Sequence, residues 1–188
     1  MLSQIFLFVL NTVCDFLSIA LLARFALQFA RASFRNPPGQ FVMAVTNWMV
    51  LPARRVIPGL FGHDLASLLL AWFWQLAYLL VAATLSSGLN GVSPAPTGMA
   101  IVALLEVIKI LLYMAFAVVF VAAIFSWVNP HAPMAGLFNS LARPMLRPFQ
   151  RVIPPIGGVD LSPLALFVLL QIALMLLASL RAYFTLYF

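Results

Sequence analysis

The stretch PARRVIPGLFGHDL at residues 52–65 returns as PFQRVIPPIGGVDL at residues 148–161, and this repetition decides the fold. The two copies are offset by 96 residues throughout. Asn36-Pro37 and Asn129-Pro130 correspond as well, at an offset of 93. Motifs that recur in the same order at nearly the same spacing indicate an internal duplication. The chain is therefore predicted to contain two copies of one structural unit.

The first copy is assigned to residues 1–90 and the second to residues 91–188. Hydrophobic residues make up 65% of the 188-residue chain and charged residues only 7%, an apolar excess that a water-soluble fold of this size has no means to bury. Lipid is therefore the expected environment. Apolar stretches close to the ~20 residues that cross a bilayer predict four transmembrane helices, at about 3–30, 64–87, 99–128 and 160–185.

Each unit places a polar, proline-rich segment between its two spans, at residues 37–62 and 130–158. Neither segment suits the bilayer interior, where every backbone group needs a partner within the protein. Both are predicted to form amphipathic helices in the membrane interface. In the first segment the apolar stripe consists of Phe41, Val45 and Trp48. In the second it consists of Met134, Phe138, Leu141 and Met145.

Two spans in each unit imply that both units enter the membrane in the same sense, as parallel repeats. The two Arg-bearing segments then lie on one side, which the positive-inside rule assigns to the cytoplasm, with both termini outside. Arg181, near the outer end of the last span, is an exception. The fold class predicted is an all-α membrane protein whose four transmembrane helices form two parallel two-helix repeats, each with a cytoplasmic interfacial amphipathic helix. Its cytoplasmic basic face comprises Arg54, Arg55, Arg143, Arg147 and Arg151.

The duplicated motif is predicted to return the chain from the surface segment into the membrane. Its prolines stiffen the loop, its glycine permits a tight bend, and its aspartate caps the following helix. As an alternative, Arg55 and Arg151, at equivalent positions, form a pseudo-symmetric site for an anion or a lipid headgroup. The residues assigned to this helix re-entry motif are Pro58, Gly62, Asp64, Pro154, Gly158 and Asp160.

Polar residues inside the predicted spans are expected to form an intramembrane polar cluster of Asn11, Asp15, Glu106 and Lys109. A lone charge at the bilayer centre costs about 2.5 to 3.5 kcal/mol on insertion scales, so charges there need partners. Asp15 and Lys109 lie at comparable depth from the outer face, and Glu106 and Lys109 are i, i+3 neighbours. We therefore predict that Asp15, Glu106 and Lys109 meet between the first and third spans, either as structural glue or as a transport site.

The two-span unit, the Asn-Pro pair that opens its surface segment and the pattern P-x-[RQ]-R-V-I-P-x-x-x-G-x-D-L resemble the YggT family of bacterial inner-membrane proteins, with chloroplast relatives called YlmG. The resemblance covers essentially the whole chain. It implies a place in the bacterial inner membrane, with both termini in the periplasm. It also implies loose roles: tolerance of osmotic stress with a link to potassium uptake and, in plastid relatives, cytochrome complex assembly and nucleoid distribution. No catalytic residues are established for the family, so the resemblance assigns none to this chain.

The sequence offers little for catalysis. His63 and His131 fall in predicted surface loops, Cys14 is the single cysteine, and no metal-ligand cluster or phosphate-binding loop is present. We therefore expect no enzyme, no cofactor and no metal. The sparse arginines suit anionic lipid headgroups better than nucleic acid. Other membrane proteins, or further copies of this chain, are the remaining expected partners.

The function predicted from the sequence is that of a non-enzymatic membrane scaffold or assembly factor, which acts through the cytoplasmic Arg-bearing face in envelope or osmotic-stress homeostasis. The rival function is a small potassium channel or a transport accessory. Conduction needs a polar path through the helices. The residues available for one are few: Asn11, Asp15, Ser18, Gln75, Glu106 and Lys109.

The parallel duplication predicts that residues 54 and 151 lie on the same side of the membrane, because each follows one outward-to-inward span of its own unit. Accessibility labelling in intact cells and in inverted vesicles measures this directly. Labelling of the two positions from opposite sides would overturn the predicted architecture and every role assigned from it.

Overall fold

The computed structural model describes residues 1–32, 34–57, 64–90, 95–129, 131–132, 134–153 and 160–187. Within these residues the chain is organised entirely by helices, joined by short connections. In chain order the helices are α1 (Leu2–Phe29), α2 (Pro37–Val56), α3 (Leu65–Asn90), α4 (Pro96–Val128), α5 (Ala135–Val152) and α6 (Ser162–Tyr187).

Four of these helices, α1, α3, α4 and α6, are long and apolar enough to cross a membrane. Their bounds lie within a few residues of the predicted spans, because long apolar runs with few charges define a span without reference to tertiary contacts. The shorter helices α2 and α5 fall inside the two predicted surface segments. The predictions of an all-helical chain and of four candidate spans are confirmed.

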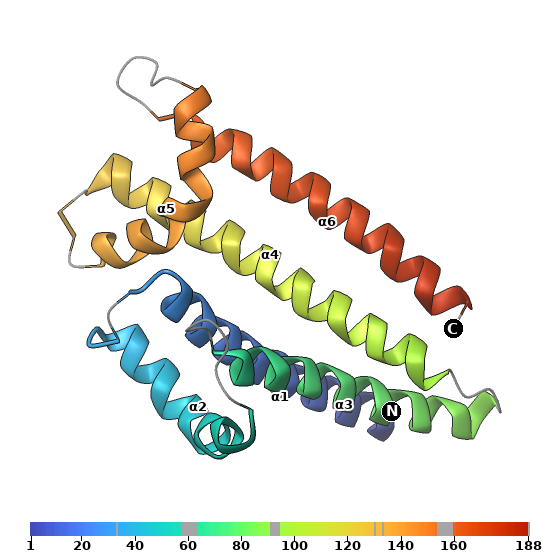
Figure 1. The fold of residues 1–188 in the computed structure, drawn as a ribbon. Coiled ribbons are helices and arrows are strands. Elements are labelled where there is room, and N and C mark those ends of the chain that lie inside the picture. Colours follow the sequence, from blue (N-terminus) through green and yellow to red (C-terminus); the bar gives the residue numbers. More distant parts are fainter. Residues whose placement is uncertain are drawn as a thin grey trace.

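The long helices pack chiefly as two pairs, α1 against α3 and α4 against α6, while α4 also packs against α3 (Figure 1). The surface helices α2 and α5 lie at one end of these pairs, and both chain termini lie at the other end (Figure 1). The side chains of α2 and α5 are therefore presented at the same end of the molecule.

Helix α2 starts at a well-formed cap. Asn36 Oδ1 accepts a hydrogen bond of 2.9 Å from the Gly39 backbone N–H, and Pro37 and Pro38 occupy the first helical positions, where a missing N–H costs nothing. A Cβ on Gly39 would lie 2.8 Å from Asn36 Oδ1 and 2.8 Å from Phe34 Cα. Glycine is therefore required here by close backbone approach.

The C-terminus of α1 is closed by a Schellman motif. Ala32 N–H donates to Leu27 O at 2.9 Å and Arg31 N–H donates to Gln28 O at 3.0 Å. Arg31 takes a positive φ of 52°, a conformation that usually selects glycine. The chain thus turns sharply out of α1 with the Arg31 side chain exposed at the surface.

Helix α5 departs from α2 in how it begins, although a proline lies inside both helices, Pro52 in α2 and its counterpart Pro148 in α5. Asn129 Oδ1 accepts from His131 N–H at 3.2 Å, yet α5 starts only at Ala135. Pro144 and Pro148 lie inside α5, and each removes a backbone donor and crowds the carbonyl four residues earlier. Figure 1 shows α5 bent along its length. The shared Asn-Pro pair therefore starts a helix at once only in the first half.

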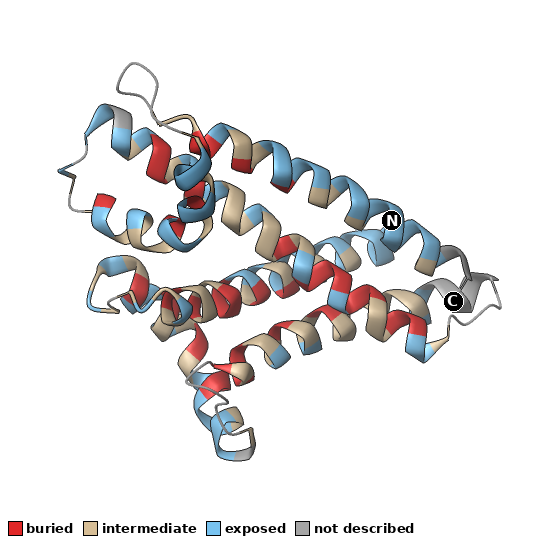
Figure 2. Ribbon diagram, turned by 45° about the horizontal axis from the view of Figure 1, so that its top comes forward, coloured by how far each residue is buried: buried red, intermediate tan, exposed pale blue. Residues whose placement is uncertain are grey.

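Buried apolar side chains form two clusters, and α4 contributes to both. The outward faces of the long helices are largely exposed (Figure 2), as expected for helices surrounded by lipid. The first cluster comprises Leu21, Leu22, Met49, Val50, Ala71, Val107 and Ile110. The second comprises Val119, Ala122, Ala142, Leu146, Leu166 and Leu170. Helix α4 therefore couples the two halves through the packed core.

The buried face of α2 is not the apolar stripe that the sequence suggested. Val42, Thr46 and Val50 are buried, whereas Phe41 and Trp48 are exposed. A helix at a membrane surface has two apolar surroundings, protein and lipid, and a hydrophobic pattern alone does not separate them. Phe41 and Trp48 therefore lie on the face of α2 that points away from the packed core.

We predict that Gly39→Ala destabilises the protein by about 1 to 3 kcal/mol, because the new Cβ would overlap backbone and cap atoms that have no room to move. Gly136→Ala is the matched control near the start of α5, where a Cβ would meet nothing within 4 Å. There alanine should be neutral or slightly stabilising. Thermal unfolding in detergent, followed by circular dichroism, measures both. Equal stability of the two variants would contradict the predicted crowding at Gly39.

Candidate functional site: a buried Arg–Asp network and an exposed arginine face

A charged network is buried where α1, α2 and the start of α3 meet. The side chain of Arg24, in α1, is 7% exposed and that of Asp64 is 1% exposed. Arg24 Nε lies 3.4 Å from Asp64 Oδ2, and Arg54 Nη2, from α2, donates to the same oxygen at 2.6 Å. One carboxylate therefore serves two guanidinium groups from two different helices.

The rest of the Arg24 guanidinium is bound by α2. Its Nη1 donates to Thr46 Oγ1 at 2.9 Å and to Asn47 Oδ1 at 2.7 Å. The Thr46 hydroxyl donates in turn to Val42 O at 2.7 Å. Buried charges are tolerated when their hydrogen-bonding groups are matched in this way. The network consequently fixes α2 against the first span.

Asp64 also caps α3. Its Oδ1 accepts from Ser67 N–H at 3.4 Å and its Oδ2 accepts from the Ser67 hydroxyl at 2.7 Å, which is the capping role that its sequence position predicts. Burial by itself raises the pKa of Asp64, but the hydrogen bonds from Arg54 and Ser67 outweigh it and hold that pKa below its ordinary value. Asp64 is therefore an anion at neutral pH.

The second half repeats the contact without the charge pair. Gln150, at the position of Arg54, donates from Nε2 to Asp160 Oδ2 at 2.8 Å, and Ser162 N–H donates to Asp160 Oδ1 at 2.9 Å. Burial raises the pKa of Asp160, and these hydrogen bonds lower it further than burial raises it. At the offset of 93 the counterpart of Arg24 is Ala117. The second half therefore lacks a buried arginine at this place.

The structure covers the predicted helix re-entry motif only in part. Asp64 and Asp160 are described and sit at the starts of α3 and α6. The proline and glycine positions, Pro58, Gly62, Pro154 and Gly158, lie outside the described residues.

All five arginines of the predicted basic face are exposed, on α2 and α5 at the same end of the molecule (Figure 1). Arg54 is the one that also faces inward, since it bonds Asp64 and donates to Gln28 Oε1 at 3.4 Å. The other four are Arg55, Arg143, Arg147 and Arg151. We call these five residues the arginine face.

The predicted cluster of Asp15, Glu106 and Lys109 is not formed. Asp15 accepts from Asn11 Nδ2 at 3.0 Å on its own helix and from Gln75 Nε2 of α3 at 2.9 Å. The prediction rested on Asp15 and Lys109 lying at the same depth in the membrane. The rotation of α1 instead turns the Asp15 carboxylate toward α3. Asn11 and Asp15, two members of the predicted polar cluster, are hydrogen-bonded to each other, whereas the predicted direct contact between Asp15 and Lys109 was wrong.

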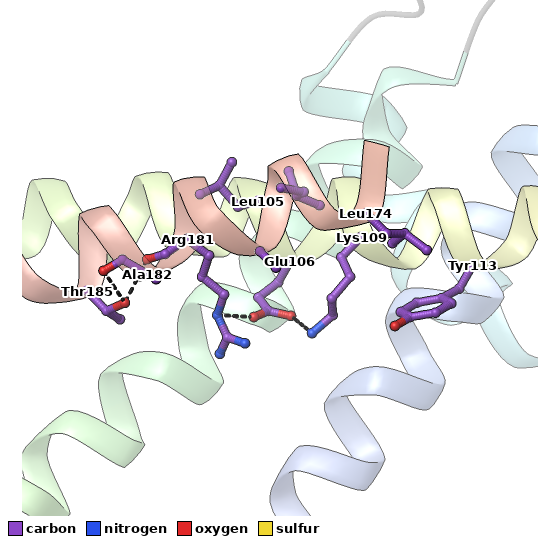
Figure 3. Close-up of a pocket in the computed structure, with 10 residues that line it drawn as sticks. Leu105, Glu106, Lys109, Tyr113, Leu174, Arg181, Ala182 and Thr185 are labelled. Carbon is purple, nitrogen blue, oxygen red and sulfur yellow. Dashed lines mark hydrogen bonds and ion pairs between the residues drawn. The ribbon is translucent and has the colours of Figure 1, made fainter. Parts of the chain in front are cut away.

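Glu106 instead pairs with two cations. It contacts Lys109 of its own helix and lies, through Oε1, 2.7 Å from Arg181 Nε of α6 (Figure 3). Sequence reasoning treated Arg181 only as an exception to the charge pattern. Counting residues along the helices would have suggested the pair of Glu106 and Arg181. Glu106 is near the start of α4 and Arg181 is near the end of antiparallel α6, so they lie at similar depths in the membrane.

The chemistry available in the described residues is electrostatic. No group of three or more His, Cys, Asp or Glu residues is close enough to hold a metal ion in the part of the chain that the structure describes. Cys14 is buried and unpaired with any other thiol. What the arrangement does offer is a set of exposed guanidinium groups on helices anchored to the spans.

Comparison with known proteins assigns the chain to a family. The CCB3/YggT family model matches it over two tandem segments, residues 3–85 and 101–181. The chain belongs to the CCB3/YggT family. Each matched segment contains two of the spanning helices and one surface helix, so both halves carry the family's pattern.

Three relatives from bacteria match along most of their length. The uncharacterised protein YggT of Escherichia coli K12 is 36% identical over 166 residues, which cover 88% of this chain and 85% of that protein. An uncharacterised protein of Vibrio alginolyticus is 36% identical, covering 88% and 89%. One from Pseudomonas aeruginosa is 35% identical, covering 92% and 88%. No solved structure matches. This chain is therefore a membrane-type CCB3/YggT protein, and these three relatives are uncharacterised proteins.

We predict that Asp64→Asn destabilises the protein by about 3 to 5 kcal/mol, because it leaves Arg24 buried without its counter-ion. Asparagine preserves the helix cap, so the loss reports the charge. Asp160→Asn is the matched control and should cost less than about 1 kcal/mol, since its partner Gln150 is neutral. Thermal unfolding in detergent measures the difference in stability between the two variants. Unfolding is monitored by circular dichroism and by the labelling of Cys14, which is buried in the folded protein.

We also predict that the wild type and Asp64→Asn differ in how their stability depends on pH. Because the folded-state pKa of Asp64 is lowered, its stabilisation is complete above the unfolded value of about 4 and is lost as pH falls through the folded value. The wild type should therefore lose stability more steeply than Asp64→Asn as pH falls below about 4. Parallel curves for the two proteins would show that ionised Asp64 contributes nothing.

Proposed function

We propose that this CCB3/YggT protein is a non-enzymatic scaffold or assembly factor of the bacterial inner membrane, which engages other membrane proteins through its arginine face and contributes to envelope or osmotic-stress homeostasis. One observation carries the proposal: five exposed arginines lie on two surface helices at one end of the spans, and Arg54 alone among them serves the interior. Exposed guanidinium groups on fixed helices suit acidic partners.

Rigidity of the face supports this role. Arg24 binds Thr46 and Asn47 in the middle of α2, and Arg54 binds Asp64 near its end. Helix α5 is packed against α4 and α6 through Ala142 and Leu146. A preorganised surface loses less conformational freedom when a partner binds. The two helices therefore present their arginines in set positions.

The distribution of positive charge supports one orientation in the membrane. We place the arginine face in the cytoplasm and both termini in the periplasm, as two parallel repeats would have it. Anionic lipid headgroups of the inner leaflet then contribute about 1 kcal/mol for each arginine near them. Acidic segments of partner membrane proteins compete with lipid for the same groups.

Conduction of potassium has less support. Of the polar residues that the sequence offered for a path, Asp15 is bonded to Gln75, and Glu106 is paired with Lys109 and Arg181. A cation path needs a continuous series of polar groups with oxygen ligands. Two fixed cations beside Glu106 would repel potassium rather than bind it.

The test replaces four arginines of the face, Arg55, Arg143, Arg147 and Arg151, with glutamine in the full chain. Arg54 is retained because it partners Asp64. In a strain lacking its own YggT homologue, the glutamine variant should fail to restore survival after hyperosmotic shock, and site-specific cross-links from α5 to neighbouring membrane proteins should be lost. Removing four charge-assisted contacts of this kind is expected to weaken association at least a hundredfold.

The matched control carries lysine at the same four positions. Lysine keeps the charge, so it should retain most of the survival and the cross-links if attraction to acidic partners is the function. Equal membrane levels and equal thermal stability must be shown for all three proteins. Full survival of cells that carry the glutamine variant would contradict the proposal. Selective potassium flux through the purified protein in liposomes would contradict it as well.

A further inference from the structure

A cavity of about 380 Å³ opens between α4 and α6 (Figure 3). It lies near the start of α4 and the end of α6, in the half of the bundle nearer the chain termini (Figure 1). Glu106, Lys109 and Tyr113 line it from α4, and Arg181 and Thr185 line it from α6. The rest of its wall is apolar and comes from Leu105, Leu174, Leu177, Ala178 and Ala182. A polar patch beside a hydrocarbon wall matches an amphiphilic ligand.

The polar patch carries an excess positive charge. Two cations, Lys109 and Arg181, flank one carboxylate, Glu106 (Figure 3). The Glu106 side chain is 10% exposed, whereas Lys109 and Arg181 are 36% and 46% exposed. Arg181 contacts Glu106 through Nε, which lies 2.7 Å from Oε1, and its two Nη groups make no hydrogen bond among the described residues. These Nη groups are therefore available to a ligand, and the ligand favoured by the net charge is an anion.

The depth of the cavity indicates what kind of anion reaches it. Helix α4 has 33 residues and is about 50 Å long, whereas a hydrocarbon core is about 30 Å thick. A centred α4 extends about 10 Å beyond each edge of the core, and Glu106 lies about 15 Å from its start. The backbone of Glu106 is thus about 5 Å inside the hydrocarbon edge and that of Lys109 about 10 Å. Long cationic side chains at that depth extend to the phosphate layer.

We propose that this cavity binds the phosphodiester of an anionic phospholipid, with Arg181 and Lys109 on the phosphate and an acyl chain along Leu105, Leu174 and Leu177. Glu106 holds the two cations apart and leaves one positive charge for the lipid. Tyr113 lines the same cavity beside the charged groups, whereas the Thr185 hydroxyl donates to Arg181 O at 2.6 Å. This lipid site is separate from the arginine face, which lies at the other end of the helices.

The probes are phosphatidylglycerol and phosphatidylcholine with identical acyl chains, titrated onto the full-length protein in detergent and counted by native mass spectrometry. The wild type should bind phosphatidylglycerol more tightly. Arg181→Gln leaves Lys109 and Glu106 balanced, so it should weaken phosphatidylglycerol about tenfold and abolish the preference. Lys109→Gln, which leaves Arg181 and Glu106 balanced, is the second variant and should act in the same direction.

Arg147→Gln is the matched control, because it removes one charge from the arginine face and none from the cavity. It should leave the tightest-bound phosphatidylglycerol unchanged. Cys14 must stay protected from labelling in each variant, as evidence of folding. Equal binding of the two lipids, an unchanged affinity in both cavity variants, or an equal loss in Arg147→Gln would overturn the proposal. Displacement of the lipid by inorganic phosphate, with equal affinity, would assign the cavity to a free anion instead.

Discussion

The ion pair between Arg24 and Asp64 is the constraint on which the first half of the structure depends. Neither side chain has appreciable contact with solvent, and an unpartnered charge at such a place is strongly destabilising. The pair therefore requires α1 and the start of α3 to stay in register, and Thr46 and Asn47 bring α2 into the same arrangement. A surface helix is thereby positioned by a group buried in a span.

The two halves solve the same structural problem with different chemistry. In both, a side chain near the end of the surface helix bonds the aspartate that opens the next span, Arg54 to Asp64 and Gln150 to Asp160. The charged version is buried more deeply and also holds Arg24, whereas the neutral version leaves α5 to be held by apolar contacts in the second cluster. Duplication preserved the contact while its electrostatics diverged.

The opposite ends of the molecule carry different charged groups. The arginine face lies at the end formed by α2 and α5, and the group of Glu106, Lys109 and Arg181 lies in the half nearer the termini. Helix α4 runs between them and takes part in both apolar clusters. Because packed interiors resist deformation, α4 links the geometry of the two ends.

The sequence by itself predicted the four candidate spans, because membrane insertion depends on the apolar content of each segment and hardly on its neighbours. It also predicted the two tandem units that the family model matches. It also placed Asp64 and Asp160 at helix starts. Only the tertiary structure decided which charges meet: Arg24 with Asp64, Arg181 with Glu106, and Asp15 with Gln75. Depth along a helix follows from counting residues, but the direction in which a side chain points depends on how neighbouring helices rotate and pack.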